Sequence, residues 1–205
     1  MISEPMTVLT DYLLAGVTAW LCFLLLRDSQ RQYSRKWWGI AFAALALGAL
    51  LGGTWHGFFQ DYLLWKATVL AIGVASCAML AGSAYAVLSG MPRTVVLAVA
   101  AAKLLVYCIL VASRDDFILV VIDTGIAFAA LAALHLWRRN GWLLAGVAVS
   151  VAAALAQAGG VALHQNFNHN DLYHVIQLAA MVLLYRGARR LSDATAPMPA
   201  PRAAG

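Results

Sequence analysis

Long apolar runs separated by short polar segments dominate the chain. About 20 mainly apolar residues suffice to cross a bilayer as a helix. Runs of roughly this length cover residues 7–26, 37–58, 62–89, 94–113, 116–137, 142–163 and 171–188. Because the connections are short, we expect consecutive helices to pack as antiparallel neighbours. The pattern therefore predicts an all-α fold, a bundle of seven transmembrane helices over residues 1–191, followed by a disordered Pro/Ala-rich cytoplasmic tail, 192–205.

Composition agrees with a membrane protein. The 205 residues are 63% hydrophobic and 11% charged, whereas a soluble domain carries about 25% charged residues. The formal net charge of +5 does not indicate nucleic-acid binding, because the basic residues form short clusters between apolar runs. The three cysteines, Cys22, Cys77 and Cys108, all lie inside apolar runs and are expected to be packing residues.

The basic residues predict the orientation of the bundle. With the N-terminus outside, eleven of the fourteen lysines and arginines fall in cytoplasmic segments, and Arg114 alone falls in an outer loop. An even number of spans would remove this bias. We therefore expect an outside N-terminus and a cytoplasmic C-terminus. The Ala-rich, short-looped sequence is typical of a bacterial inner (cytoplasmic) membrane, so membrane lipids are the expected partners.

Most histidines gather at the outer end of this topology. His56 ends the second run and Asp61 opens the third, while His164, His169, Asp171 and His174 surround the start of the seventh. Asn170 and His174 are four residues apart and Asp171 and His174 three, so either pair can share a helix face. The small residues Ala49, Gly52 and Gly53 precede His56 and allow a neighbouring helix to approach closely.

Ionisable residues inside spans are costly and are expected to find partners. Asp123 lies at a depth similar to that of Lys103 on the neighbouring helix, which predicts a buried ion pair. Lys66, one turn into the third span, is expected to neutralise Asp11 or Asp61.

Three imidazoles near a carboxylate are typical of a catalytic zinc site, which keeps a fourth position for water. Such a site would support hydrolysis of an amide or ester bond. A structural polar cluster that ties helices together is the alternative, and so is a b-type haem ligated by His56 and His174. The chain contains no HExxH or CxxC motif that would decide between these alternatives.

The seven spans, Thr54-Trp55-His56 at the end of the second and the His/Asn/Asp motif opening the seventh resemble the superfamily of alkaline ceramidases and progestin and adipoQ receptors. The resemblance implies a zinc-dependent amide or ester hydrolase that acts on a lipid. It implies that His56 and His174 are zinc ligands.

The chain departs from the superfamily pattern at several positions, and the acidic residue of the superfamily lies deeper in the third span than Asp61. Asn170 stands at the first histidine of the last-helix motif and Gly52 at the helix-2 serine. The third ligand is then expected to be His169, with His164 or Asp171 as the alternatives.

The expected roles of the remaining site residues follow from this assignment. Asp61 or Asp171 would position the water, Thr54 would assist an oxyanion, and Asn170 would support the site or bind the substrate. A non-enzymatic membrane protein remains the alternative to a metal-dependent lipid amidohydrolase.

Overall fold

The computed structural model describes residues 2–29 and 31–195, and it confirms the all-α fold. Seven helices follow one another along this part of the chain. They are α1 (Pro5–Arg27), α2 (Tyr33–Gly57), α3 (Tyr62–Val87), α4 (Gly90–Ser113), α5 (Ile118–Trp137), α6 (Gly141–Ala158) and α7 (His169–Ala188).

Six of these helices, α1 to α6, are long and apolar enough to cross a membrane. α7 has 20 residues but is more polar, because Asn170, Asp171, His174 and Gln177 occupy its first half. The chain is therefore a helical membrane protein in which the most polar helix is packed among apolar ones.

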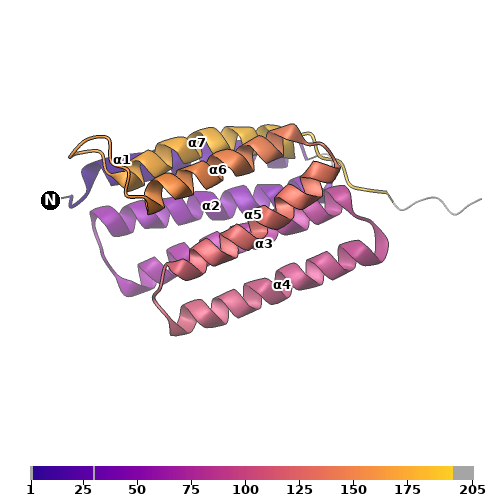
Figure 1. Ribbon diagram of the computed structural model, residues 1–205, viewed down its shortest axis with the longest axis horizontal. Helices are drawn as coiled ribbons and strands as arrows, with labels where there is room; N and C mark the ends of the chain where they lie inside the picture. The colour runs from indigo at the N-terminus through magenta and orange to yellow at the C-terminus, as the bar shows by residue number, and fades with distance from the viewer. Residues whose placement is uncertain (1, 30, 196–205) are drawn as a thin grey trace, which may run out of the picture.

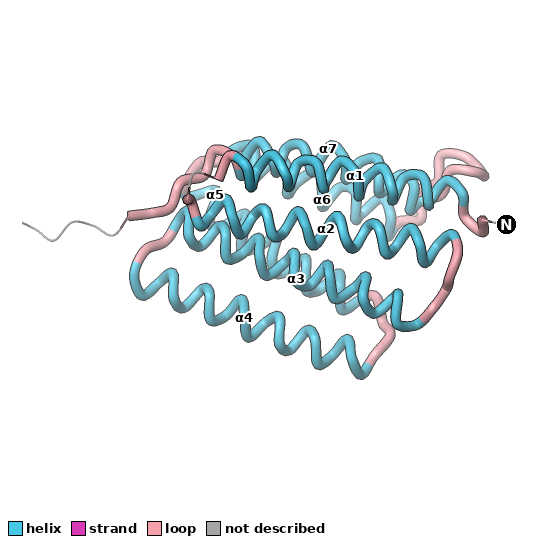
Figure 2. The backbone as a smooth tube through the Cα atoms, turned by 180° about the vertical axis from the view of Figure 1, so that it is seen from behind, coloured by secondary structure: helices cyan, strands magenta, loops and turns pink. Residues whose placement is uncertain are grey.

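The helices lie side by side along a common direction (Figures 1 and 2). α1 packs against α2 and α7, α6 packs against α7, and α3 contacts α2, α4 and α5. α4 lies at the periphery of the bundle, and only Ala100, Tyr107 and Val111 of its residues are buried. The main core lies between the other helices and includes Leu25, Trp38, Phe42, Leu131, Leu143 and Leu184.

Two helix boundaries near the histidines differ from the predicted runs. α6 ends at Ala158 rather than at 163, because Gly159 and Gly160 follow and Gly160 adopts a φ of +64° that continues no helix. The freed residues form a loop in which the backbones of His164 and Phe167 bond to each other. α7 begins at His169 rather than at 171, because Asn168 caps its N-terminus.

The segment after Leu191 fastens onto the first turn of α2. Both oxygens of Asp193 accept hydrogen bonds, from the backbone N–H groups of Tyr33 and Ser34, each at 2.8 Å. The Asp193 N–H in turn donates to Oε1 of Gln32 at 2.6 Å. These contacts supply the N-terminal cap of α2, so the expected tail starts later than residue 192. Residues 196–205 of that tail lie outside the described residues.

Polar contacts attach α4 to its neighbours. The predicted Lys103–Asp123 ion pair is confirmed, and Nζ of Lys103 also donates to Oγ of Ser76 at 2.8 Å. The prediction for Lys66 is wrong, because its Nζ pairs with Asp115 at 2.6 Å. The two expected partners are engaged elsewhere: Asp61 accepts from the N–H groups of Leu63 and Leu64, and Asp11 faces His174.

The Lys103–Asp123 pair is expected to stabilise the fold only as a pair. Asp123→Leu should lower the free energy of unfolding by about 3–5 kcal/mol, because it leaves the Lys103 ammonium buried without a counter-charge. The double variant Lys103→Met/Asp123→Leu should recover most of that loss. Thermal unfolding in detergent micelles measures both, and a double variant as unstable as the single one would contradict a structural role.

Candidate functional site

The site begins with a polar stripe on α1. Thr7, Thr10, Asp11 and Thr18 are all buried, although they lie in an apolar helix. Their spacing of three, four and seven residues places them on one helix face. That face is turned toward α7, which contributes the buried Asp171, His174 and Gln177.

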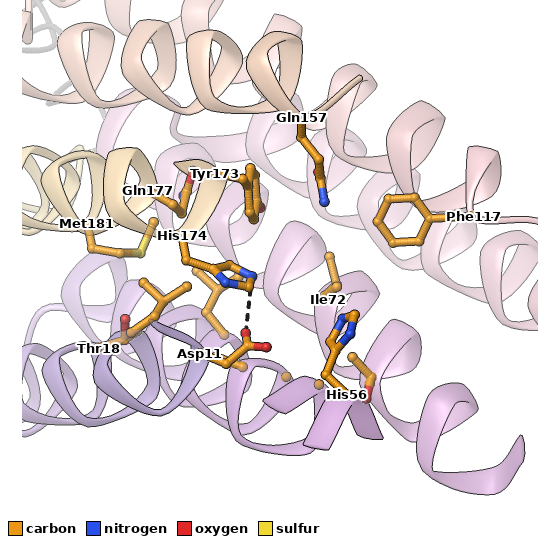
Figure 3. A pocket seen from close by; sticks show the side chains of 16 residues that line it. Asp11, Thr18, His56, Ile72, Phe117, Gln157, Tyr173, His174, Gln177 and Met181 are labelled. Carbon is orange, nitrogen blue, oxygen red and sulfur yellow. Dashed lines mark ion pairs between the residues drawn. The ribbon is translucent and has the colours of Figure 1, made fainter. Parts of the chain in front are cut away.

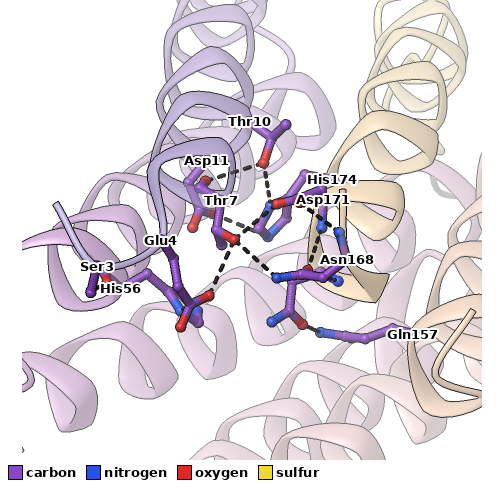
Figure 4. Close-up of polar contacts among 11 residues, drawn as sticks. Ser3, Glu4, Thr7, Thr10, Asp11, His56, Gln157, Asn168, Asp171 and His174 are labelled. Carbon is purple, nitrogen blue, oxygen red and sulfur yellow. Dashed lines mark hydrogen bonds and ion pairs between the residues drawn. The ribbon is translucent and has the colours of Figure 1, made fainter. Parts of the chain in front are cut away.

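Asp171 joins the start of α7 to α1. Its Oδ2 accepts from the N–H of Asn168 at 2.8 Å, while the Asn168 side chain accepts from the N–H groups of Asn170 and Asp171, which forms a capping box. Its Oδ1 accepts from the Thr7 hydroxyl at 2.9 Å (Figure 4). Both oxygens of Asp171 are therefore engaged in holding the helix terminus.

His174 lies between two residues of α1. Its Nε2 is 3.1 Å from Oδ1 of Asp11, and its Nδ1 is 3.0 Å from Oγ1 of Thr10 (Figures 3 and 4). The Thr10 hydroxyl also lies 3.1 Å from the Thr7 carbonyl. Both ring nitrogens of His174 are therefore held by α1, one beside a hydroxyl and the other beside a carboxylate.

His56 reaches the same region from the last turn of α2. A Cβ at Gly53 would lie 2.8 Å from Cβ of Asp11. α1 and α2 therefore approach each other more closely at this point than a residue larger than glycine would allow. This confirms the expected role of the small residues before His56. Nδ1 of His56 lies 3.3 Å from Oε2 of Glu4 but forms no well-aligned hydrogen bond.

Asp11, His56 and His174 line one cavity of about 160 Å³. Figure 3 shows the three side chains around this space, with Tyr173, Gln157 and Phe117 on the opposite side. Oδ2 of Asp11 is buried and has no hydrogen-bond partner among the described residues. A buried polar atom without a partner costs about 1–3 kcal/mol, so this atom is suited to accept a hydrogen bond from a ligand.

A second, larger cavity of about 330 Å³ adjoins the first. It lies between α5, α6 and α7, and most of its lining is apolar, including Val120, Phe128, Val151 and Leu155. Seven residues line both cavities, namely Leu45, Ile72, Phe117, Gln157, Tyr173, Gln177 and Met181. The polar and apolar spaces are therefore neighbours across a shared wall.

The other expected site residues lie outside the polar cavity. Asp61 is exposed and caps α3, and the Thr54 hydroxyl donates to the Leu50 carbonyl and lies 3.0 Å from the Tyr12 hydroxyl. Asn170 accepts from Gln157 at 2.9 Å. His169 is the first residue of α7, and the exposed His164 accepts from the Asn166 N–H. Neither of these two histidines lines the cavity.

The donor set has the chemical types of a zinc site, since two imidazoles and one carboxylate surround the cavity. Among residues 2–29 and 31–195, however, no three His, Cys, Asp or Glu side chains lie close enough to hold one metal ion. In this arrangement the residues do not fit a three-ligand zinc centre.

The position of Asp11 in the sequence predicts a place near the outer end of the bundle but does not predict its contact with His174. The available signal was the spacing of Thr7, Thr10 and Asp11 at i, i+3 and i+4 in an otherwise apolar span. Glu4, beside His56, was missed because it precedes the apolar run.

Comparison with known proteins finds no matching curated protein and no matching solved structure. One family model matches residues 6–193, which include all seven helices apart from the first residue of α1. The chain belongs to this family, DUF6962, which is described as a family of unknown function.

Proposed function

We propose that this protein is a seven-span membrane protein that binds an amphipathic lipid inside its helix bundle. The polar end of the lipid lies against Asp11, His56 and His174, and its hydrocarbon part fills the apolar cavity between α5, α6 and α7. The observation that carries the proposal is the wall shared by the two cavities.

The chemistry of the polar cavity favours a neutral head group. The cavity is lined by a carboxylate and two imidazoles, and by no lysine or arginine. Oδ2 of Asp11 offers an unused acceptor, which suits a hydroxyl or an amide N–H on the lipid. A phosphate group would be repelled by the negative charge of Asp11 and by the carboxylates of Glu4 and Asp171, which lie at the same end of the bundle.

The Asp11–His174 pair adds acid–base capacity to this binding site. Nε2 of His174 faces Oδ1 of Asp11, and Nδ1 is oriented by Thr10. A group of this kind can give a proton to a bound hydroxyl or amide, or accept one from it.

Binding should depend on both cavities. Asp11→Ala should weaken binding of a monoacylglycerol or an N-acyl amino alcohol about tenfold, because it removes a charged hydrogen-bond acceptor. Gly125→Leu should also weaken binding, because Gly125 lines the apolar cavity and a side chain there meets open space. Native mass spectrometry of the detergent-solubilised protein measures both effects.

Gly16→Leu is the matched control for the apolar cavity. Gly16 is also a helical glycine with open space around it, but it lies on α1 and lines neither cavity. This variant should bind the lipid like the wild type. Binding at the wild-type level by either Gly125→Leu or Asp11→Ala would refute the proposed site.

Zinc-dependent hydrolysis of an amide or ester bond in that lipid is the second candidate function. The observation that favours it is the Nδ1–Thr10 contact of His174, because zinc-binding histidines usually donate their other ring N–H to a nearby acceptor. Binding of zinc would require His56 to approach Asp11 and His174.

Elemental analysis of the purified protein tests this candidate. This candidate requires about one zinc per chain, lost in Asp11→Ala and His174→Ala and retained in His169→Ala, because His169 does not line the cavity. Metal-free wild-type protein, or equal zinc in all variants, would exclude it. A Soret band in the same preparation would indicate the haem alternative instead.

The proposed orientation places the histidine end of the bundle outside and the C-terminus in the cytoplasm, with α7 as the seventh span. A fluorescent protein fused after residue 195 should be fluorescent, and alkaline phosphatase at the same place should be inactive. The reverse pattern would mean an even number of spans or an inverted bundle.

A further inference from the structure

The end of the bundle opposite His56 and His174 has a different chemistry. Arg138, Arg139 and Arg190 line an open basin of about 670 Å³ together with Asn140 and Trp142. The basin lies where α5 turns into α6, beside the end of α7. It takes no part in the lipid site proposed above.

The arginines around this basin lack counter-charges. None of them forms an ion pair with a carboxylate in the described part of the chain, where Asp28 pairs with Arg27 and Asp193 caps α2. The side chains of Arg186 and Arg190 both stack on the ring of Trp142, with 5.1 and 5.4 Å from the guanidinium carbon to the ring centroid. Two like charges four residues apart repel each other, so an anion between them would stabilise the arrangement.

Arg139 occupies a backbone position that favours glycine. Its φ is +53°, and it follows α5 in a turn where the Asn140 N–H bonds to the His135 carbonyl and the Arg139 N–H to the Leu136 carbonyl. Glycine is the usual residue at this position of a helix C-terminus. An arginine in this left-handed backbone conformation costs about 1 kcal/mol of stability relative to glycine. Arg139 therefore bears a backbone cost that glycine would not, and its side chain lines the basin.

The surroundings indicate a lipid rather than a soluble anion. Leu136 and Trp137, directly before the two arginines, are 64% and 71% exposed. An exposed apolar surface beside a basic basin suits the acyl chains and the head group of one phospholipid. Guanidinium groups bind phosphate through paired, charge-assisted hydrogen bonds.

We propose that the basin formed by Arg138, Arg139, Arg190 and Trp142 binds the phosphate group of an anionic phospholipid. The lipid bridges the α5–α6 turn and the end of α7.

Binding of dioctanoyl phosphatidylglycerol to the full-length protein in neutral detergent tests this site, with dioctanoyl phosphatidylcholine as the neutral comparison. Arg139→Gly should weaken binding of the anionic lipid about fivefold, and Arg190→Gln should do the same. Arg139→Gly should also raise the melting temperature of the lipid-free protein, because it relieves the backbone cost at this position. A residue that only stabilises the turn would not produce these opposite effects.

Two variants serve as matched controls. Arg31→Gly also replaces an arginine of positive φ, +65°, but Arg31 does not line the basin. Arg189→Gln removes one charge next to Arg190 and likewise leaves the basin intact. Both should bind phosphatidylglycerol like the wild type.

The competing outcomes are distinct. Equal affinity for the two lipids, or an equal loss in Arg31→Gly and Arg139→Gly, would overturn the proposal, because surface charge alone would then explain binding. Inorganic phosphate that displaces the lipid at millimolar concentration would assign the basin to a soluble phosphate compound and would overturn the lipid assignment.

Discussion

A charged side chain inside an apolar helix bundle needs a partner within the bundle, since water is not there to solvate it. Asp11 is such a side chain, and its contact with His174 determines which faces of α1 and α7 meet. Thr7 and Thr10 lie on the same face of α1 as Asp11. Their hydroxyl groups contact Asp171 and Nδ1 of His174. The close approach of α2 at Gly53 then brings His56 to the cavity.

The two ends of the bundle differ in what they can bind. The end with the histidines contains carboxylates and imidazoles beside an apolar cavity, which suits neutral polar groups on a hydrocarbon chain. The opposite end is rich in arginine, and its carboxylates are already engaged. The two proposed sites therefore suit chemically different lipids, and they share no residue.

Much of the fold could be predicted because hydrophobic run length and helix formation are local properties. The seven helices and the Lys103–Asp123 pair follow from apolar runs and from matching depths in adjacent spans. The partners of the histidines could not be predicted in this way, because they depend on how helices rotate about their axes. Asp61 and Asp171 are near the histidines in sequence, yet their oxygens cap helices. Asp11 lies far from His174 in sequence but is its direct partner.

The hydrogen bonds between Asp193 and the first turn of α2 have a consequence for biosynthesis. Tyr33 and Ser34 are synthesised early. Asp193, whose carboxylate accepts hydrogen bonds from their N–H groups, is synthesised only after all seven helices. This cap of the second helix can therefore form only after the C-terminal segment has been synthesised and has returned to the beginning of the chain.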